Sequence, residues 1–156
     1  MAIRHIITEG DEALTKVCRA VENFDNRLAM LLDDLKETMI HADGVGLAAP
    51  QVGVLRRVAV VDIGEGLVEL VNPEIVFEEG EQEMQEGCLS CPGVYGTTKR
   101  PQKIKVIAQN RKGEHIEFEA EGLFAVACCH EIDHLSGILF REHVVRMESK
   151  DGIEAL

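Results

Sequence analysis

The stretch GLFAVACCHEIDHLSG, residues 122–137, decides the fold. Its spacing predicts a helix, because five residues at i, i+3, i+4, i+7 and i+11 share one helical stripe. These residues are Leu123, Val126, Ala127, His130 and His134. Gly137 is a natural end for this helix, since glycine readily adopts the left-handed conformation found after helix C-termini. The helix should therefore turn an apolar stripe and two histidines toward the interior.

The two histidines form part of an HExxH motif. His130 and His134 lie four residues apart, so their rings stack on one helical face and can bind one divalent ion. Glu131 is rotated by about 100° from His130, which puts it beside such an ion without requiring it to be a ligand. That is the position of a general base acting on a metal-bound water. The motif predicts a hydrolytic metal site.

A third ligand has to come from outside this helix. Cys129 is turned by about 100° and Cys128 by about 200° from His130, so neither is expected to reach the ion. We interpret both as small buried residues. The segment QEGCLSCPGVYG, residues 85–96, offers Cys88 and Cys91. If the segment is extended, these two thiols at i, i+3 point to opposite faces, and one ion should not collect both.

A closed zinc site with four protein ligands is the structural alternative. Cys88 and Cys91 followed by the two histidines give a Cys2His2 set. However, 38 residues lie between Cys91 and His130, beyond the roughly 12–15 of a compact zinc finger. Four ligands would also leave no open position for chemistry, whereas a catalytic site keeps three ligands and one exchangeable position.

The rest of the chain predicts one helix and several short strands. Residues 24–44 repeat leucines at helical spacing, with Asp25 as the cap and Gly44 as the stop. Residues 44–54, GVGLAAPQVGV, break this pattern and read as a loop. Four segments rich in β-branched residues predict strands: 56–63, 67–77, 103–110 and 115–120. The last two should form a hairpin that turns at residues 111–113.

We therefore expect one domain over residues 1–156, of the α+β class. Short, mainly antiparallel strands should pack around the C-terminal helix that bears HExxH, with an amphipathic helix nearer the N-terminus. No linker, repeat or low-complexity tract divides the chain.

Composition excludes several classes of function. The net charge of −12 makes the chain a poor ligand for phosphate backbones, so we expect no unassisted binding to nucleic acid. No apolar run approaches the roughly 20 residues of a membrane span, and the acidic start lacks a signal core. The five cysteines are odd in number, which disfavours a disulfide framework. We expect a cytoplasmic protein.

Three motifs in order resemble a known family. GVGLAAPQ at 44–51, EGCLS at 86–90 and HEIDH at 130–134 have the order and spacing found in bacterial peptide deformylases. One such motif would be weak support, but three in order are specific. The similarity covers nearly the whole chain, from the early helix to the segment FREHV at 140–144.

The resemblance implies roles for individual residues. The metal ligands would be Cys88, His130 and His134, with Glu131 as the catalytic acid. The oxyanion would be stabilised by the Gln51 side chain and the backbone N–H of Leu89. Binding of the substrate would involve the backbone of Gly46 and a pocket for the methionine side chain formed by Val45, Leu123, Val126 and Ala127. Glu86 and Arg100 match supporting positions, as a charge pair.

The resemblance also implies the reaction and the partners. The enzyme would remove the formyl group from N-formylmethionyl nascent peptides and release formate. The family implies Fe(2+) as the ion in many bacteria, and a thiolate with two imidazoles also accepts Zn(2+), Ni(2+) or Co(2+). The ribosome is a candidate partner. The chain ends in RMESKDGIEAL, residues 146–156, which is short and acidic where some relatives carry a longer basic extension.

Two positions depart from the family pattern, and two other functions compete. Cys129 stands where the family usually has glutamine, and we expect altered support rather than lost chemistry. Cys91 stands where many relatives carry an aliphatic residue. The competing functions are an HExxH zinc endopeptidase, which a thiolate ligand argues against, and a non-catalytic structural zinc-binding module.

Overall fold

The computed structural model of the chain describes residues 2–148. Within them lie two α-helices, α1 (Asn26–His41) and α2 (Gly122–Leu135), and three short 3-10 helices, η1 (Glu12–Thr15), η2 (Ala49–Val52) and η3 (Phe140–His143). The strands are β1 (Gly46–Ala48), β2 (Val58–Val61), β3 (Val68–Glu79), β4 (Gln82–Cys88), β5 (Cys91–Arg100), β6 (Lys103–Gln109), β7 (His115–Glu121) and β8 (Val144–Glu148). The expected α+β class and antiparallel pairing are confirmed.

A five-stranded sheet in the order β1-β2-β3-β6-β7 separates the two α-helices. Every neighbouring pair is antiparallel. Successive residues of β2 point to opposite faces, as the two-residue period of a strand requires. Val58 and Val60 pack in the cluster that contains the leucines of α1, while Ala59 and Val61 pack in the cluster that contains α2. The continuous run of apolar residues in β2 is thus explained by a helix on each face.

Helix α1 begins where the sequence predicts and ends earlier. The Asp25 side chain accepts a hydrogen bond from the Leu28 N–H at 3.1 Å, which caps the helix. The helix ends at His41, and the Gly44 N–H then bonds the Met39 carbonyl at 3.0 Å. Gly44 therefore lies beyond the last helical turn rather than at its stop.

The expectation that residues 44–54 form a loop is wrong in part. Residues 46–48 form β1, at one edge of the five-stranded sheet, and residues 49–52 form η2. All three residues of β1 are buried. Residues 46–48 lack the β-branched residues that signal a strand. Gly46 and Ala48, which lie toward α2, are small and let the helix approach the sheet closely.

A second sheet, in the order β4-β5-β8, was not predicted as strands. Strands β4 and β5 are a hairpin that turns at Leu89 and Ser90, so Cys88 pairs directly with Cys91. The expectation that these cysteines point to opposite faces of an extended segment is therefore wrong. The tight turn reverses the chain between them and places them opposite each other.

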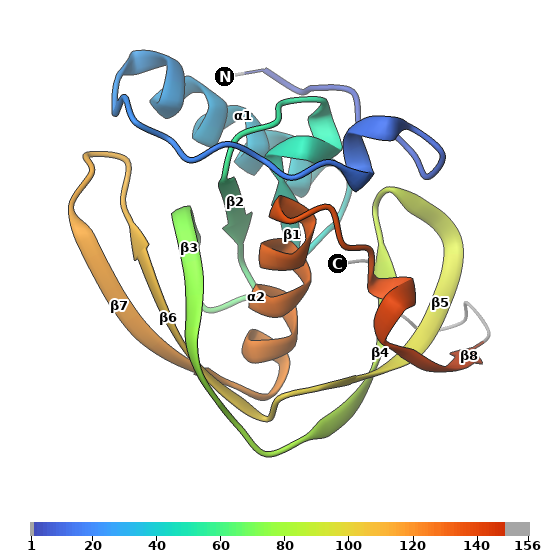
Figure 1. Cartoon of the computed structure of the whole chain (residues 1–156). Coiled ribbons are helices and arrows are strands. Elements are labelled where there is room, and N and C mark those ends of the chain that lie inside the picture. Colours follow the sequence, from blue (N-terminus) through green and yellow to red (C-terminus); the bar gives the residue numbers. More distant parts are fainter. Residues whose placement is uncertain (1, 149–156) are drawn as a thin grey trace.

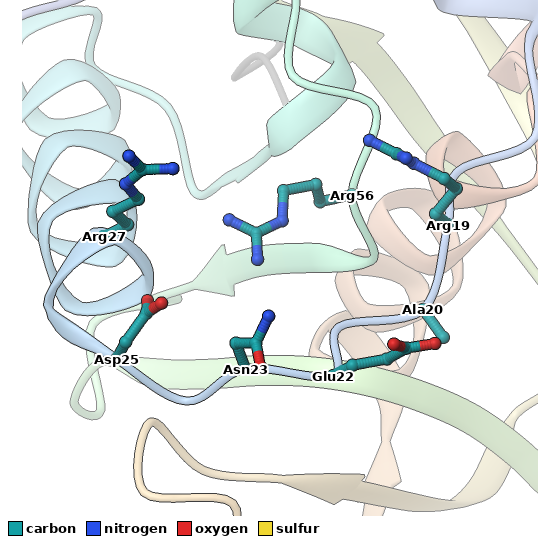
Figure 2. A pocket seen from close by; sticks show the side chains of 7 residues that line it. All are labelled: Arg19, Ala20, Glu22, Asn23, Asp25, Arg27 and Arg56. Carbon is teal, nitrogen blue, oxygen red and sulfur yellow. The ribbon is translucent and has the colours of Figure 1, made fainter.

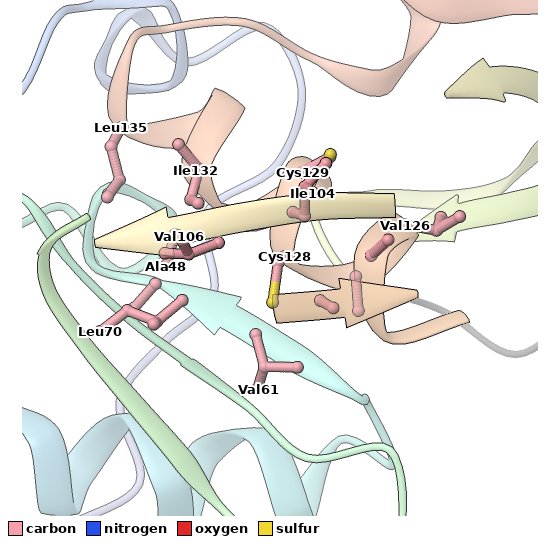
Figure 3. Packing of buried hydrophobic residues seen from close by; sticks show 14 of the residues in the cluster. Ala48, Val61, Leu70, Ile104, Val106, Val126, Cys128, Cys129, Ile132 and Leu135 are labelled. Atoms are coloured by element: carbon pink, nitrogen blue, oxygen red, sulfur yellow. The ribbon is translucent and has the colours of Figure 1, made fainter. Parts of the chain in front are cut away.

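Helix α2 lies between the two sheets, with β3, β6 and β7 on one side and β4, β5 and β8 on the other (Figure 1). Its residues Val126, Cys128 and Leu135 have no exposed surface and pack against strands of the five-stranded sheet (Figure 3). Gly137 follows the helix at φ 75°, as predicted, and a β-carbon there would lie 2.6 Å from the Thr15 carbonyl oxygen. No helix in the described part is long and apolar enough to cross a membrane.

Candidate metal centre

Three side chains from two elements converge beside the buried face of α2. Cys88 comes from the end of β4, and His130 and His134 come from α2. Their ligand atoms all lie within 4.8 Å of one another, and each side chain is at most 2% exposed. Cys88 Sγ is 3.4 Å from His134 Nε2, which is 3.2 Å from His130 Nε2. In residues 2–148 this is the one group with metal-ligand geometry.

The arrangement fits a divalent ion. Bond lengths of about 2.0–2.3 Å in a tetrahedral site place neighbouring ligand atoms roughly 3.3–3.7 Å apart, close to the two observed separations. Burial lowers the pKa of His134 well below its usual value, which keeps the ring neutral and able to coordinate. The hydrogen bond with Cys91 and burial raise the pKa of the Cys88 thiol, so a thiolate here needs a cation beside it.

A buried carboxylate orients one of the histidines. Glu86 Oε1 lies 2.9 Å from His130 Nδ1, which leaves Nε2 of that ring facing Cys88 and His134. Arg100 bonds both carboxylate oxygens of Glu86, at 2.8 and 3.0 Å, and the expected charge pair is confirmed. Burial acts to raise the pKa of Glu86, but the hydrogen bonds from His130 and Arg100 lower it to about 2. Glu86 is therefore a fixed anion behind His130.

The ion-pair network continues to α2 itself. Arg100 Nη1 lies 2.8 Å from Asp133 Oδ2, and His143 Nε2 lies 3.0 Å from the same oxygen. Asp133 lies within the HExxH segment, at one of its two variable positions. Sequence reasoning missed Asp133, Thr98 (whose hydroxyl bonds Glu86) and Ser90. Asp133 and Ser90 are polar residues within HEIDH and EGCLS, which was the available signal for them, whereas Thr98 lies outside both motifs.

Glu131 is buried beside the histidines with no hydrogen-bond partner within residues 2–148. Neither carboxylate oxygen is satisfied, and the side chain has no exposed surface. Burial raises the pKa of Glu131 to about 7. A carboxyl group with that pKa can both accept and donate a proton near neutral pH. The orphaned oxygens next to the ligand group fit a site built around an ion and a water.

Gln51 and Leu89 flank Cys88. Gln51 is fully buried in η2, and its Oε1 accepts from the Ala48 N–H at 2.9 Å. The amide Nε2 is thereby turned toward Cys88 Sγ at 3.6 Å and Ser90 Oγ at 3.0 Å. Leu89 is the first residue of the turn between β4 and β5. Both expected oxyanion donors thus belong to residues adjoining the thiol.

The expected substrate-binding residues are only partly brought together. Gly46 lies in β1, next to the Glu131 carboxylate. Val45, Val126 and Ala127 belong to one buried cluster, while Leu123 lies in the first turn of α2 and is 39% exposed. Val45 also lines a cavity of about 370 Å³ that includes Gly44 and Ile63.

The other cysteines lie outside the ligand group. Cys128 and Cys129 are buried in the apolar cluster of α2, and burial raises the pKa of Cys129 to about 12 (Figure 3). Cys91 is buried next to Cys88 but does not join the group. Three candidate ligands, rather than four, are therefore brought together among the described residues.

A cavity of about 650 Å³ elsewhere contains none of the expected site residues. Figure 2 shows it between the segment before α1 and the turn before β2, where the guanidinium groups of Arg19, Arg27 and Arg56 face it together with Glu22 and Asp25. The group of Cys88, His130 and His134 therefore lies outside this cavity.

Comparison with known proteins identifies the family. The family model for polypeptide deformylase matches residues 3–150. The chain belongs to the peptide deformylase family. Peptide deformylase from Acetivibrio thermocellus is 58% identical over 154 residues, which cover 99% of this chain and 91% of that protein. The crystal structure of peptide deformylase from Thermotoga maritima has a TM-score of 0.91 at 41% identity, covering 92% of this chain and 99% of that one.

A deformylase from Synechococcus elongatus, solved in complex with actinonin, has a TM-score of 0.88 at 36% identity and covers 94% of this chain and 80% of that one. Peptide deformylases are metalloenzymes that remove the formyl group from N-terminal formylmethionine. This chain is therefore a deformylase acting in protein biosynthesis. The group of Cys88, His130 and His134 is its possible metal site.

Proposed function

We propose that the deformylase reaction is carried by Cys88, His130 and His134 as metal ligands, Glu131 as acid and base, and Gln51 with the Leu89 N–H as oxyanion donors, within one catalytic domain over residues 1–156. The observation that carries this proposal is the convergence of three buried side chains whose possible ligand atoms lie within 4.8 Å, beside a buried carboxylate that has no hydrogen-bond partner within residues 2–148. When bound, a divalent ion supplies a water whose pKa is lowered toward neutrality and polarises the formyl oxygen.

Glu131 moves the proton. One of its oxygens takes a proton from the attacking water, and the same carboxyl group then gives it to the leaving nitrogen. Without that transfer, breaking the C–N bond would expel a nitrogen anion, which is a poor leaving group. The pKa near 7 that burial produces suits a group that must work in both directions.

Gln51 and Leu89 meet the negative charge that develops on the formyl oxygen. The Gln51 amide is held with Nε2 toward Cys88 by the bond from the Ala48 N–H to its Oε1, so the donor is oriented before the reaction begins. The Leu89 N–H follows the ligand Cys88 directly in the turn. Two donors that adjoin the same thiol can address one oxygen.

The substrate peptide pairs with β1 through Gly46. Strand β1 is an edge of the five-stranded sheet, and an extended peptide can add to such an edge by main-chain hydrogen bonds. The methionine side chain then enters the apolar region of Val45, Val126 and Ala127, with Leu123 at its exposed margin.

The working ion in the cell is Fe(2+), and Zn(2+), Ni(2+) or Co(2+) bind the same ligands. The substrates are nascent formylmethionyl peptides, so the enzyme works in the cytoplasm with the ribosome as a candidate partner. Some relatives carry a longer basic extension where this chain has the short acidic end 146–156. Most of that end, residues 149–156, lies outside the described residues.

The experiment joins formate release to metal content. With N-formyl-Met peptides as substrates, Glu131→Ala should retain its ion and lose nearly all activity. Cys88→Ser should lose most of the ion and the thiolate-to-metal absorption of a Co(II) form, whereas Cys91→Ser should keep both. Activity of Glu131→Ala near that of wild type would refute its role. Loss of the band in Cys91→Ser would mean four ligands.

Metal analysis of protein purified without oxygen identifies the ion. A blocked peptide in the same assay should not be cleaved at an internal bond, since internal cleavage would favour an endopeptidase.

A further inference from the structure

The cysteine pair at the turn between β4 and β5 has a geometry that the deformylase reaction does not use. Cys88 and Cys91 are direct cross-strand partners, separated by the two turn residues. The two thiols are close enough that each shifts the pKa of the other, and each side chain is 2% exposed. Cross-strand partners in antiparallel pairs have Cα atoms about 4.5–5.5 Å apart, within the roughly 4.4–6.8 Å that a disulfide spans.

Cys91 stands between the ligand and the surface. The Arg141 guanidinium is close enough to Cys91 that each group shifts the pKa of the other, and Arg141 Nη2 donates to Glu9 Oε2 at 2.8 Å. The side chains of Arg141 and Glu9 are 42% and 35% exposed. The side chains beside Cys91 are therefore themselves partly exposed to solvent.

The two consecutive cysteines of α2 are not placed to pair with each other. Cys128 and Cys129 are consecutive in α2, where Cα atoms lie about 3.8 Å apart and side chains diverge by about 100°. Both are buried in the apolar cluster with Cys18. Among the described residues, only Cys88 joins the metal group and also has a cysteine as its strand partner.

We propose that Cys88 and Cys91 are a peroxide-oxidation site, in which disulfide formation removes the thiolate ligand and releases the metal ion. The release step rests on the proposed role of Cys88 as a ligand. Two imidazoles alone hold a divalent ion weakly, so the oxidised chain is an inactive form that keeps its fold. Thiol reduction and a fresh ion return it to activity.

The oxidant is hydrogen peroxide. One sulfur attacks a peroxide oxygen, the O–O bond breaks, and a sulfenic acid and one water form. The other sulfur then attacks the sulfenic sulfur, the S–S bond forms, and the S–O bond breaks to release a second water. Two thiols and one peroxide thus yield one disulfide and two waters, with two electrons passing from sulfur to oxygen.

Cys91 also determines how far oxidation proceeds. With Cys91 adjacent, a sulfenic acid on Cys88 is captured as a disulfide, which thiols reverse. Without Cys91, the sulfenic acid continues to sulfinic and sulfonic acids, which thiols do not reverse. The second cysteine therefore makes the lesion repairable.

The test uses the zinc-loaded full chain treated with hydrogen peroxide in stoichiometric steps. Wild type is compared with Cys91→Ser, Cys91→Ala and the matched control Cys129→Ser. The readouts are peptide mapping by mass spectrometry, zinc released to a chromophoric chelator, and deformylation after dithiothreitol and added zinc. Two Cys91 variants are used so that a folding defect in one does not decide the result.

Wild type and Cys129→Ser should show a Cys88–Cys91 crosslink, a mass loss of about 2 Da at that peptide, one zinc released per crosslink, and full recovery. Beyond one equivalent of peroxide, the Cys91 variants should show two or three oxygens added at Cys88 and no recovery. Recovery in the Cys91 variants equal to wild type, or a crosslink between other cysteines, would overturn the proposal.

A Cys88–Cys91 crosslink that leaves zinc bound would overturn the release step. In that case Cys88→Ser would also retain zinc, which traces the failure to the proposed ligand set. If Cys88→Ser loses zinc and no crosslink forms in wild type, the ligand assignment stands and the oxidation site falls.

Discussion

Gly46 and Glu131 are packed so closely that the carboxylate occupies the space a side chain at position 46 would need. A β-carbon on Gly46 would lie 2.8 Å from Glu131 Cδ and closer still to Oε2. Real β-carbons essentially never approach a neighbour under 3.0 Å. The edge strand that we assign to the substrate therefore also fixes the position of the proton-transferring group.

Gly46→Ala should displace the Glu131 carboxylate and lower kcat/KM by about 10²-fold, the effect of a misplacement near 1 Å. Metal content should be unchanged, because the three atoms nearest to the added β-carbon all belong to Glu131. Steady-state kinetics with metal analysis checks this. In a double-mutant cycle, Glu131→Asp should cost less activity in the Gly46→Ala background than in wild type, because the shorter side chain relieves the clash. Simple additivity would contradict the steric explanation.

Gln51→Ala should lower kcat by about 10²–10³-fold with a smaller change in KM, the cost of one oxyanion donor. The Ala48 N–H would also lose its buried acceptor, at a cost of about 1–3 kcal/mol in folding free energy. Ser90→Ala, which removes only a partner of Gln51 Nε2, should lower kcat less. An effect confined to KM would show that Gln51 only binds substrate.

Glu86→Gln should weaken zinc binding about 10–100-fold, because the carboxylate that orients His130 is lost. Competition with a chelator of known affinity measures this. Glu83→Gln is the matched control, since Glu83 lies on the same strand with its side chain exposed. Equal affinities for the two variants would rule out the orienting role.

Removing the ion should lower the melting temperature. Cys88 belongs to the three-stranded sheet, whereas His130 and His134 belong to the helix packed on the five-stranded sheet. An ion held by all three therefore joins the two sheets, and free metal at 1,000 times Kd stabilises the fold by about 4 kcal/mol. Scanning calorimetry with and without chelator tests this. Cys88→Ser should no longer respond to the chelator, and an unchanged wild-type melting temperature would contradict the link.

Asp34→Asn should destabilise the fold by about 1 kcal/mol at neutral pH. Asp34 accepts from the Ala2 N–H at 2.7 Å and the Arg4 Nε at 2.9 Å. Burial acts to raise the pKa of Asp34, but these hydrogen bonds lower it overall. A lowered folded pKa means that the stabilisation is present above the unfolded pKa, about 3.9, and is lost as the pH falls through the folded value.

The stability difference between wild type and Asp34→Asn should therefore vanish in acid. Denaturant unfolding at a series of pH values measures it. Glu37→Gln on the same helix is the control, since within residues 2–148 no hydrogen bond or ion pair involves that carboxylate. A difference that persists at the lowest pH would exclude the charge as its cause.

The helices and the central strands could be predicted because their patterns are periodic. Leu28, Leu32 and Leu35 repeat at helical spacing, and the hairpin of residues 103–121 alternates in burial as it does in sequence. The second sheet was missed because β4 reads QEMQEGC, with few β-branched or aromatic residues. Its strand structure comes from pairing with β5, which in turn pairs with β8, a strand more than 40 residues later in the chain.

The metal group could be predicted in part from physics. Helical geometry placed His130, His134 and Glu131, and it excluded Cys128 and Cys129. The assignment of Cys88 over Cys91 came from resemblance. The extended segment expected there is instead a hairpin that turns at Leu89–Ser90. The closeness of Gly46 to Glu131 could not be predicted, because it depends on how β1 packs against a helix some 80 residues later.

The placement of α2 against β1 and β2 has a consequence for how the protein is made. The apolar faces of Ala48, Ala59 and Val61 remain without a partner until residues 125–135 have been synthesised, since those faces pack on α2. Strand β3 likewise waits for β6. Pairings so distant in sequence form slowly and late. An enzyme that processes emerging chains is therefore inactive throughout most of its own emergence, and its early segments depend on the last helix for protection.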